Sequence, residues 1–265
     1  MSASLQRLWF FLFCLLAGEC FADDYFYRAD SREPGEFQSR RIPGPGIYSR
    51  GVDDAYDANG ARIPNVSLYR HALGTPDGNT RYDDGYVSTT RSLTMAHNIG
   101  QQMLGAYSRY YIYVIVPGPN LYDVNAVLGR YSPHPMEGEF AALGGIPWSQ
   151  VAGWYVVEWG RMNPVMVRNP RHQPRIYAST RLPLLGESYR LAGFPENHRA
   201  WREPPWANYA APGCGATPRK RSLMPVDVCL KNQVDMANEK FVQFSKLVRR
   251  RLAALSVTPS SYYQE

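Results

Sequence analysis

The chain is 265 residues long, which is enough for one large domain or two small ones with a sizeable core. Hydrophobic residues make up 45% of the chain and charged residues 20%. Those proportions are ordinary for a globular protein and exclude a disordered or fibrous chain. The 19 tyrosines, 21 prolines and 22 glycines favour a mixed, loop-rich fold over a helical bundle.

The formal net charge of +6 is concentrated near the C-terminus. From residue 214 onward, nine basic and four acidic side chains contribute +5, so the rest of the chain is nearly neutral. A general nucleic-acid binder needs a basic stripe across its folded body. The charge pattern therefore predicts no nucleic-acid partner.

The first 22 residues predict a secretory signal peptide. Arg7 precedes an apolar run that ends at Ala17, and Cys20-Phe21-Ala22 places small residues three before and one before a cut. The run is too short to span a bilayer, and no later segment is long and apolar enough to be transmembrane. Lipid attachment at Cys20 is the weaker alternative, because Glu19 stands where such sites want a small residue. We expect an exported, soluble mature protein.

The mature body alternates strand-like and helix-like segments without a βαβ rhythm. Residues 25–28 predict a short aromatic strand, and residues 86–90 predict another. A helix is expected to begin near Ser92, with an apolar face of Leu93, Ala96, Ile99 and Met103. The two clearest strands are rich in β-branched and aromatic residues and cover residues 110–116 and 151–159. Two intervals are expected to be irregular, residues 33–65 and 163–213.

The segment Glu137-Gly138-Glu139 is the most suggestive candidate for chemistry. In an extended segment, the two carboxylates point to the same face, with Cα atoms about 6.5 Å apart. One carboxylate can then stabilise positive charge while the other orients or deprotonates a nucleophile. An isolated Glu-x-Glu leaves a solvated acidic turn open as the alternative.

Other polar residues of the body are ambiguous by themselves. Arg28, expected at the end of its strand, suits either a phosphate contact or the bracing of a loop. Ser88 and Thr89 are equally compatible with an ordinary edge strand. Neither His71 nor His134 has partners at metal-ligand spacing, so we expect no metal site.

Cys214 and Cys229 are the two cysteines that remain after removal of the signal peptide, and in an exported protein they predict a disulfide. Closing a loop of this length stabilises by about 3 kcal/mol in the chain-entropy model. The loop contains the basic run from Arg219 to Arg221, and exposed polar loops are where proteases cut. A plain structural bridge is one interpretation. We favour the other, a cut after Arg219 or Arg221 that divides residues 23–221 from residues 222–265.

The segment after Cys229 predicts a long amphipathic helix. Apolar residues recur every three or four positions from Leu230 to Leu255, and Pro259 ends the pattern. Roughly 26 residues correspond to about 39 Å of helix. Its apolar stripe packs either on the same chain or on a partner protein, and the pattern leaves both open.

Several segments resemble a known family. The Arg28, Ser88–Thr89 and Glu137–Glu139 elements resemble the Arg–Ser–Glu signature of ADP-ribosyltransferase toxins. More widely, residues from about 25 to 215 are similar to the A subunits of cholera toxin and heat-labile enterotoxin. The likeness weakens between residues 40 and 65, where we expect a short insertion, and again beyond residue 229. It is carried by YRADSR at 27–32, DDGYVST at 83–89, YYIYVI at 110–115, YSPHP at 131–135, ALGGIP at 142–147, LAGFP at 191–195, HRAWRE at 198–203 and PGCG at 212–215.

The resemblance implies a role for each matching residue. Glu139 corresponds to the glutamate that hydrogen-bonds the nicotinamide ribose and stabilises the oxocarbenium-like state. Glu137 corresponds to the glutamate that orients an acceptor arginine. His71 corresponds to the family's active-site histidine and Ser88 to a serine that braces the site. The residues implied around NAD are Arg28, Ala29, Asp30, Ser31, Arg32, Arg50, His71 and Ser88.

The resemblance also implies a fold, an activity and partners. The expected fold is an α+β ADP-ribosyltransferase fold, with two small mixed sheets around an NAD cleft, then an irregular segment and the long helix. The implied reaction is transfer of ADP-ribose from NAD to an arginine of the host stimulatory G-protein α subunit, which raises cAMP. The implied partners are a host ADP-ribosylation factor, as an activator, and a pentameric B subunit. The implied route is export through the periplasm and action in the host cytosol.

Two alternatives to this activity stay open. An NAD glycohydrolase would use water in place of the acceptor arginine, and a non-catalytic adaptor would keep the fold only to dock partners. The C-terminal segment from Tyr262 to Glu265 also departs from the family, whose tail ends in a retrieval signal resembling Lys-Asp-Glu-Leu. We therefore expect entry into cells not to depend on that retrieval receptor.

Overall fold

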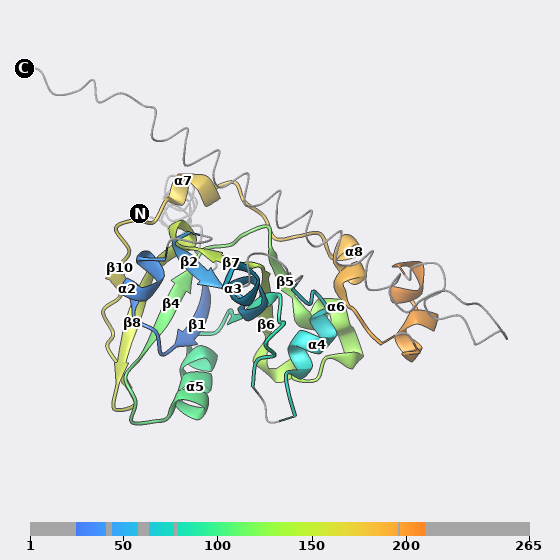
Figure 1. Ribbon diagram of the computed structural model, residues 1–265, viewed down its shortest axis with the longest axis horizontal. Coiled ribbons are helices and arrows are strands. Elements are labelled where there is room, and N and C mark those ends of the chain that lie inside the picture. Colours follow the sequence, from blue (N-terminus) through green and yellow to red (C-terminus); the bar gives the residue numbers. More distant parts are fainter. Residues whose placement is uncertain (1–24, 41–43, 58–63, 77–78, 196, 210–265) are drawn as a thin grey trace, which may run out of the picture.

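The computed structural model describes residues 25–40, 44–57, 64–76, 79–195 and 197–209. The predicted signal peptide, the Cys214–Cys229 bridge, the cutting sites at Arg219 and Arg221 and the helix over residues 230–255 lie outside these ranges. Figure 1 shows the described part as a central sheet with short helices on either side. None of the helices in the described ranges is long and apolar enough to cross a membrane.

The larger sheet has eight strands in the order β10-β8-β4-β1-β3-β6-β5, with β9 paired to β8 (Figure 1). A second sheet consists of β2 and β7. The ladders between the named strands of the described part are all antiparallel. The strands are β1 (Phe26–Asp30), β2 (Gly46–Tyr48), β3 (Tyr86–Thr90), β4 (Tyr110–Ile115), β5 (Leu121–Asp123), β6 (Glu139–Leu143), β7 (Gly145–Pro147), β8 (Val151–Glu158), β9 (Arg161–Met162) and β10 (Val167–Arg168).

The helices are mostly short and cover the sheet. Those before β6 are α2 (Pro34–Gln38), α3 (Arg50–Asp57), α4 (Leu68–Leu73), α5 (Leu93–Leu104) and α6 (Val124–Leu128), with 3-10 turns η1 (Gly129–Tyr131) and η2 (Pro135–Glu137). Those after β7 are η3 (Trp148–Gln150), α7 (Pro174–Tyr177), α8 (Leu185–Ser188), η4 (Tyr189–Leu191), η5 (Arg199–Arg202) and η6 (Trp206–Tyr209).

The strongest sequence patterns correspond to the observed elements. β3 covers the predicted residues, and the two clearest strand patterns become β4 and β8, each one residue shorter at its end than expected. Ser92 begins α5 as predicted, because its side chain accepts a hydrogen bond from the Met95 backbone N–H. The predicted apolar face of α5 is wrong at Met103, which is exposed. Gly100 is buried instead, since the Tyr110 ring leaves no room there for a Cβ atom.

The expectation that residues 33–65 form one irregular loop is wrong. The segment contains α2, β2 and α3. A capping box between Glu33 and Glu36 starts α2, and the Phe37 side chain is buried against Tyr113 and Trp148. These long-range aromatic contacts stabilise a segment whose local composition favours turns. The expectation that residues 163–213 are largely irregular agrees with the structure, because the elements in the described part of that interval have only two to four residues each.

The larger sheet has two halves that meet at a single residue pair. β1 pairs with β4 over five residues, and β3 pairs with β6 over five residues. Between β1 and β3 the register contains only Tyr27 opposite Thr90. The two strands therefore diverge beyond this pair, and we call this place the strand junction.

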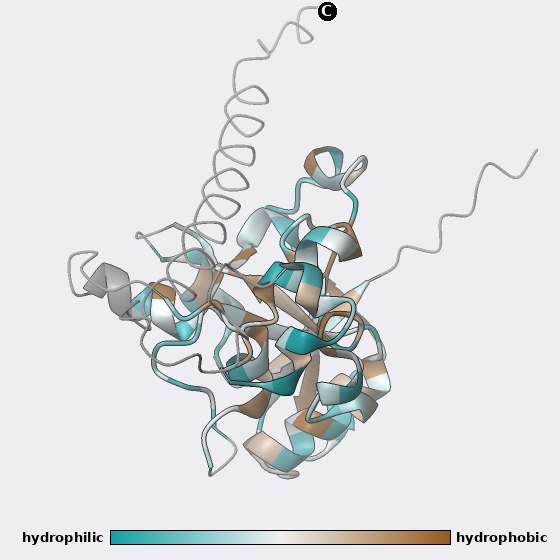
Figure 2. Cartoon of the chain, turned by 90° about the vertical axis from the view of Figure 1, so that its right-hand side faces the viewer, coloured by the Kyte–Doolittle hydropathy of each residue, from teal (hydrophilic) through white to brown (hydrophobic). Residues whose placement is uncertain are grey.

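Three apolar clusters pack on the larger sheet. One cluster joins Tyr86, Ala141 and Leu143 of the β3–β6 half to Leu68 of α4 and Trp201 of η5. A second lies around Phe26, Tyr113 and Trp148, and a third lies under α5 around Tyr110 and Ile112. In Figure 2 the central strands are predominantly brown, whereas teal segments are common on the outer helices and loops. The second cluster also contains Val87, Phe140 and Ala142 of the β3–β6 half, so it packs across both halves of the sheet.

Candidate active site at the strand junction

One face of β3 and β6 carries most of the candidate residues. Ser88 lies opposite Ala141, and Thr90 lies opposite Glu139. Because side chains alternate along a strand, Ser88 and Glu139 point to the same face as Ala141. Ala141 belongs to the cluster that contains Leu68, so α4 packs on this face and brings His71 to it.

His71 lies between two carboxylates. Its Nδ1 is 2.7 Å from Asp84 Oδ2, and its Nε2 is 2.8 Å from Glu139 Oε1. The side chain is 4% exposed. Burial disfavours a charged ring, but the charges and hydrogen bonds of Asp84 and Glu139 outweigh burial and raise the pKa of His71 to about 10. His71 is therefore an imidazolium at neutral pH.

Glu139 is ionised in spite of its burial. Burial raises the pKa of this carboxyl group, but the neighbouring His71 charge and hydrogen bonds from His71 and Ser88 lower it below its usual value. The Ser88 hydroxyl also lies 3.3 Å from His71 Nε2. The result is a fixed negative charge at the beginning of β6. Such a charge can stabilise positive charge that develops on a bound substrate.

Glu137 does not share an extended segment with Glu139, and that expectation is wrong. Glu137 ends η2, and Gly138 is left-handed with φ 55° before β6 begins at Glu139. The cause is local, because Pro135 opens the 3-10 turn and the Glu137 N–H donates to the His134 carbonyl. Glu137 is half-buried, and its pKa is raised by burial and by the charge of Glu139. A carboxylate of this kind is a suitable proton acceptor.

Arg28 lies in the middle of β1, which corrects the expectation that it ends the strand. Ala29 and Asp30 continue the pairing with β4. The Arg28 Nη1 donates to the Ser88 carbonyl at 3.0 Å, and its Nε donates to Asp30 Oδ2 at 3.2 Å. A guanidinium group thus crosses the strand junction where the backbone ladder stops. A guanidinium group has the chemistry to bind a phosphate.

Asp30 orients the neighbouring arginines. It is buried and accepts hydrogen bonds from the Arg32 backbone N–H at 3.1 Å and from the Arg32 guanidinium at 2.9 and 2.7 Å. Burial raises the pKa of Asp30, but Arg32 and Arg28 together lower it to about 2. Ala29 faces α5, since a Cβ on Gly100 would lie 3.0 Å from the Ala29 Cβ. The Ala29 backbone pairs with Ile112 of β4, and Ser31 after the strand is exposed.

Arg50 lies apart from these contacts. It begins α3, and its Nη1 donates to the Thr80 carbonyl at 3.4 Å. It lines a hollow of about 500 Å³ together with Thr75, Asn79, Thr80, Tyr82 and Met103. The connection to the rest of the site is through the backbone, because the Gly51 N–H donates to the Asp84 carbonyl at 2.8 Å.

The structure therefore brings together five side chains at the strand junction, and we call them the junction site: Arg28, His71, Asp84, Ser88 and Glu139. Asp84 is the member that the sequence reasoning missed as a functional residue. It stands inside the quoted DDGYVST segment, four residues before Ser88, but nothing in its spacing predicts a contact with His71.

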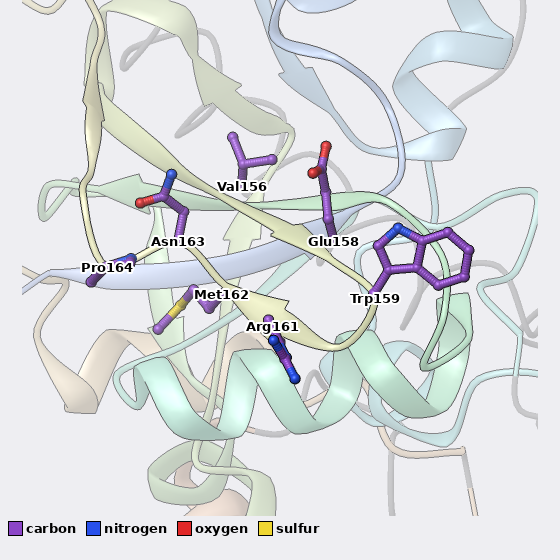
Figure 3. Close-up of a pocket in the computed structure, with 7 residues that line it drawn as sticks. All are labelled: Val156, Glu158, Trp159, Arg161, Met162, Asn163 and Pro164. Carbon is purple, nitrogen blue, oxygen red and sulfur yellow. The ribbon is translucent and has the colours of Figure 1, made fainter.

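A larger hollow in the described part does not coincide with the junction site. It has a volume of about 710 Å³, and Figure 3 shows its lining on the β8–β9 hairpin and the two residues that follow it. All seven of these lining residues come from this one segment (Figure 3). In the described ranges, no cluster of three or more His, Cys, Asp or Glu side chains has the arrangement of a metal site.

Comparison with known proteins assigns the chain to a family. The model of the family described as heat-labile enterotoxin alpha chain matches residues 6–265. The chain belongs to the heat-labile enterotoxin A chain family. The predicted family, the α+β fold class and the enzyme class, an ADP-ribosylating toxin component that uses NAD, are therefore confirmed. In detail, the larger of the two predicted sheets has eight strands, and its strands are antiparallel rather than mixed.

Individual relatives cover most of the chain. The chain is 48% identical over 228 residues to the heat-labile enterotoxin IIA A chain of Escherichia coli, covering 86% of this chain and 85% of that one. It is 47% identical over 216 residues to the A subunit of the cholera enterotoxin of Vibrio cholerae, covering 81% of each chain. It is also 49% identical over 215 residues to the NAD(+)–arginine ADP-ribosyltransferase Chelt of Vibrio cholerae, covering 81% of this chain but only 35% of that protein.

A solved structure agrees with this assignment. A double mutant of heat-labile enterotoxin superposes with a TM-score of 0.74 and 41% identity, covering 90% of this chain and 98% of that chain. The fold thus has a structural counterpart in this family.

Proposed function

We propose that this chain transfers ADP-ribose from NAD to an arginine side chain of a host protein, and that the junction site and Glu137 carry the reaction. The observation that supports this most directly is the convergence at the strand junction. Arg28 contacts Ser88, Ser88 contacts His71, and His71 contacts Glu139. Arg28, a cation suited to phosphate, is thus connected to the buried carboxylate of Glu139 through Ser88 and His71.

In this reaction, the bond between nicotinamide and C1′ of its ribose breaks, and nicotinamide leaves with the electron pair. Positive charge then develops on the sugar, and Glu139 is the preorganised negative charge that stabilises it. His71 and Ser88 hold Glu139 through the hydrogen bonds described above. Since a carboxylate has several acceptor positions, Glu139 keeps capacity to accept from a ribose hydroxyl.

Glu137 acts on the acceptor. An arginine nitrogen attacks C1′, forms the new C–N bond and gives up a proton. Glu137 accepts that proton and aligns the guanidinium, since its pKa is raised by burial and by the neighbouring Glu139. Its position at the end of η2 places it outside the strand ladder.

Arg28 and the residues after it bind the anionic part of NAD. The Arg28 guanidinium suits a diphosphate. Asp30 holds both Arg28 and Arg32 in place, and Arg50 is a further cationic contact beside the 75–82 segment. Arg28, Asp30, Arg32 and Arg50 thus supply binding, whereas Glu139 and Glu137 supply the chemistry.

The remainder of the chain supplies delivery and partners. We propose that residues 1–22 are removed on export and that the Cys214–Cys229 bridge joins residues 23–221 to residues 222–265 after a cut. We further propose that the helix over residues 230–255 binds a pentameric B subunit. The acceptor is the stimulatory G-protein α subunit, and a host ADP-ribosylation factor activates the enzyme.

The experiment that tests the activity uses the nicked, reduced protein with radiolabelled NAD and a host-cell lysate. Label that is attached to an arginine supports the proposal. Free ADP-ribose without labelled protein supports the glycohydrolase instead, and NAD that stays intact supports a non-catalytic adaptor.

Two variants separate the roles of the glutamates. Glu139→Gln should abolish both NAD hydrolysis and transfer, because the charge that stabilises the oxocarbenium-like state is gone. Glu137→Gln should lose transfer to arginine while keeping appreciable NAD hydrolysis, because only the acceptor step fails. Glu158→Gln, at an exposed ion pair with Arg109, is the matched control and should leave both activities intact. Equal loss of both activities in Glu137→Gln would refute the division of roles.

A further inference from the structure

Asp84 is fixed more tightly than a loop aspartate requires. Its side chain is 3% exposed, Oδ1 accepts from the Tyr86 N–H at 3.0 Å, and Oδ2 lies 2.7 Å from His71 Nδ1. Its backbone is also held, because its carbonyl accepts from the Gly51 N–H. A Cβ on residue 51 would lie 2.5 Å from the Asp83 carbonyl oxygen, so α3 packs directly on this turn. Both carboxylate oxygens of Asp84 thus have assigned partners.

The two carboxylates determine the protonation of the ring between them. Ionised carboxylates only accept hydrogen bonds, whereas a neutral imidazole has one donor and one acceptor nitrogen. His71 Nδ1 faces Asp84 and Nε2 faces Glu139, so two ionised carboxylates require a proton on both ring nitrogens. A neutral ring with its proton on Nδ1 would leave Nε2 and Glu139 as two acceptors in contact.

We propose that Asp84 is a positioning residue of the reaction, which acts by keeping His71 a doubly protonated imidazolium that orients Glu139 and holds it ionised. This inference rests on the proposed function, because it assigns Asp84 to the same site. Asp84 itself need not touch the substrate, since its effect reaches Glu139 through the ring.

Other titratable groups also face the triad of Asp84, His71 and Glu139. The Tyr86 ring centroid lies 5.2 Å from that of His71, and burial keeps its hydroxyl neutral by raising its pKa. His134 and Glu137, at the η2 turn, act on Glu139 or are acted on by it. None of these residues is itself substituted in Asp84→Asn. The Asp84 charge is a smaller cause of the raised Tyr86 pKa than burial, and burial remains, so the Tyr86 hydroxyl stays neutral.

The substitution Asp84→Asn alters charge with little change of shape. The asparagine Oδ1 can keep the hydrogen bond from the Tyr86 N–H, which places Nδ2 against His71 Nδ1. An amide NH₂ donates, so Nδ1 must then accept, and His71 becomes neutral with its proton on Nε2. The contact with Glu139 survives, but Glu139 loses the adjacent positive charge. A carboxylate without that charge takes up a proton at higher pH.

The test is the pH dependence of NAD hydrolysis, measured as kcat/KM without an acceptor for the full nicked protein. The acid limb of the Asp84→Asn profile should move to higher pH. The ratio of variant to wild-type kcat/KM should fall by at least about tenfold between pH 8 and pH 5.5, since each pH unit below the pKa of an essential carboxylate costs tenfold. Asp83→Asn is the matched control, because Asp83 contacts Arg81 and Asn65 instead, and its ratio should stay constant.

A second pair of variants tests whether Asp84 acts through the ring. In His71→Gln the imidazole is absent, so adding Asp84→Asn should not move the acid limb further. The same movement in the His71→Gln background would overturn the proposal, as would a ratio of Asp84→Asn to wild-type activity that is constant with pH.

Nuclear magnetic resonance of the wild-type His71 ring keeps the proposal testable if the variants fail to fold. Both ring nitrogens should remain protonated from pH 5.5 to 8.5, and loss of a ring proton within that range would overturn the inference. Failure of the proposed function would give a different result, because in that case neither wild type nor Asp83→Asn would cleave NAD.

Discussion

The His71 contacts predict how the stability of the protein depends on pH. The pKa of His71 is raised from 6.5 to about 10 in the folded protein. A raised pKa means that the folded state holds a proton that the unfolded state releases above pH 6.5. The stabilisation is therefore complete below pH 6.5 and is lost as the pH rises toward 10.

The size of the effect follows from this difference. One proton held only by the folded state changes the free energy of unfolding by about 1.4 kcal/mol per pH unit. Between pH 6.5 and pH 9.5 the His71 contribution should thus fall by about 4 kcal/mol. Little of this is lost to solvent screening, because the His71 side chain is 4% exposed and Asp84 is 3% exposed.

The measurement compares urea unfolding of wild type and His71→Gln at several pH values. Groups that do not contact His71 titrate alike in both proteins, so their contributions cancel in the difference. The wild-type free energy of unfolding should fall more steeply with pH, so the two curves should converge by about 4 kcal/mol at pH 9.5. His97→Gln is the matched control, because His97 Nδ1 contacts the Tyr110 hydroxyl rather than a carboxylate.

Parallel curves for wild type and His71→Gln would refute the reasoning. They would mean that the folded protein does not hold an additional proton on His71 above pH 6.5.

Two further predictions concern Gly138 and the Cys214–Cys229 loop. Gly138→Ala should destabilise the protein by about 1 kcal/mol in urea unfolding and reduce transfer more than NAD hydrolysis, because a left-handed φ of 55° strains alanine next to Glu137. Gly35→Ala is the control, because an added Cβ meets nothing within 4 Å at either glycine and only Gly138 of the two has a positive φ. A similar loss of stability in both variants would contradict the explanation. Limited trypsin should cut after Arg219 or Arg221, giving fragments near residues 23–221 and 222–265 that separate on gels only after reduction. Separation without reductant would exclude the predicted bridge.

The sequence alone was sufficient for the features that depend on local pattern. Continuous apolar and aromatic runs predicted β4 and β8, because a buried strand requires them along its whole length. Ser92 indicated the start of α5 through its capping side chain. The segments around Arg28, Ser88 and Glu139 carried the family resemblance that the comparisons confirmed.

Only the tertiary structure decided how these residues meet. Glu137 left the expected extended segment because Pro135 and Gly138 turn the chain, and Arg28 became a mid-strand residue because β4 continues to pair beyond it. Asp84 contacts His71 because α4 packs on β3 and β6 and places the His71 ring between two carboxylates. Strand alternation can be derived from neighbouring residues, whereas the position of α4 depends on apolar contacts between residues far apart in the chain. The charge state of His71 follows from that packing, and no local pattern contains it.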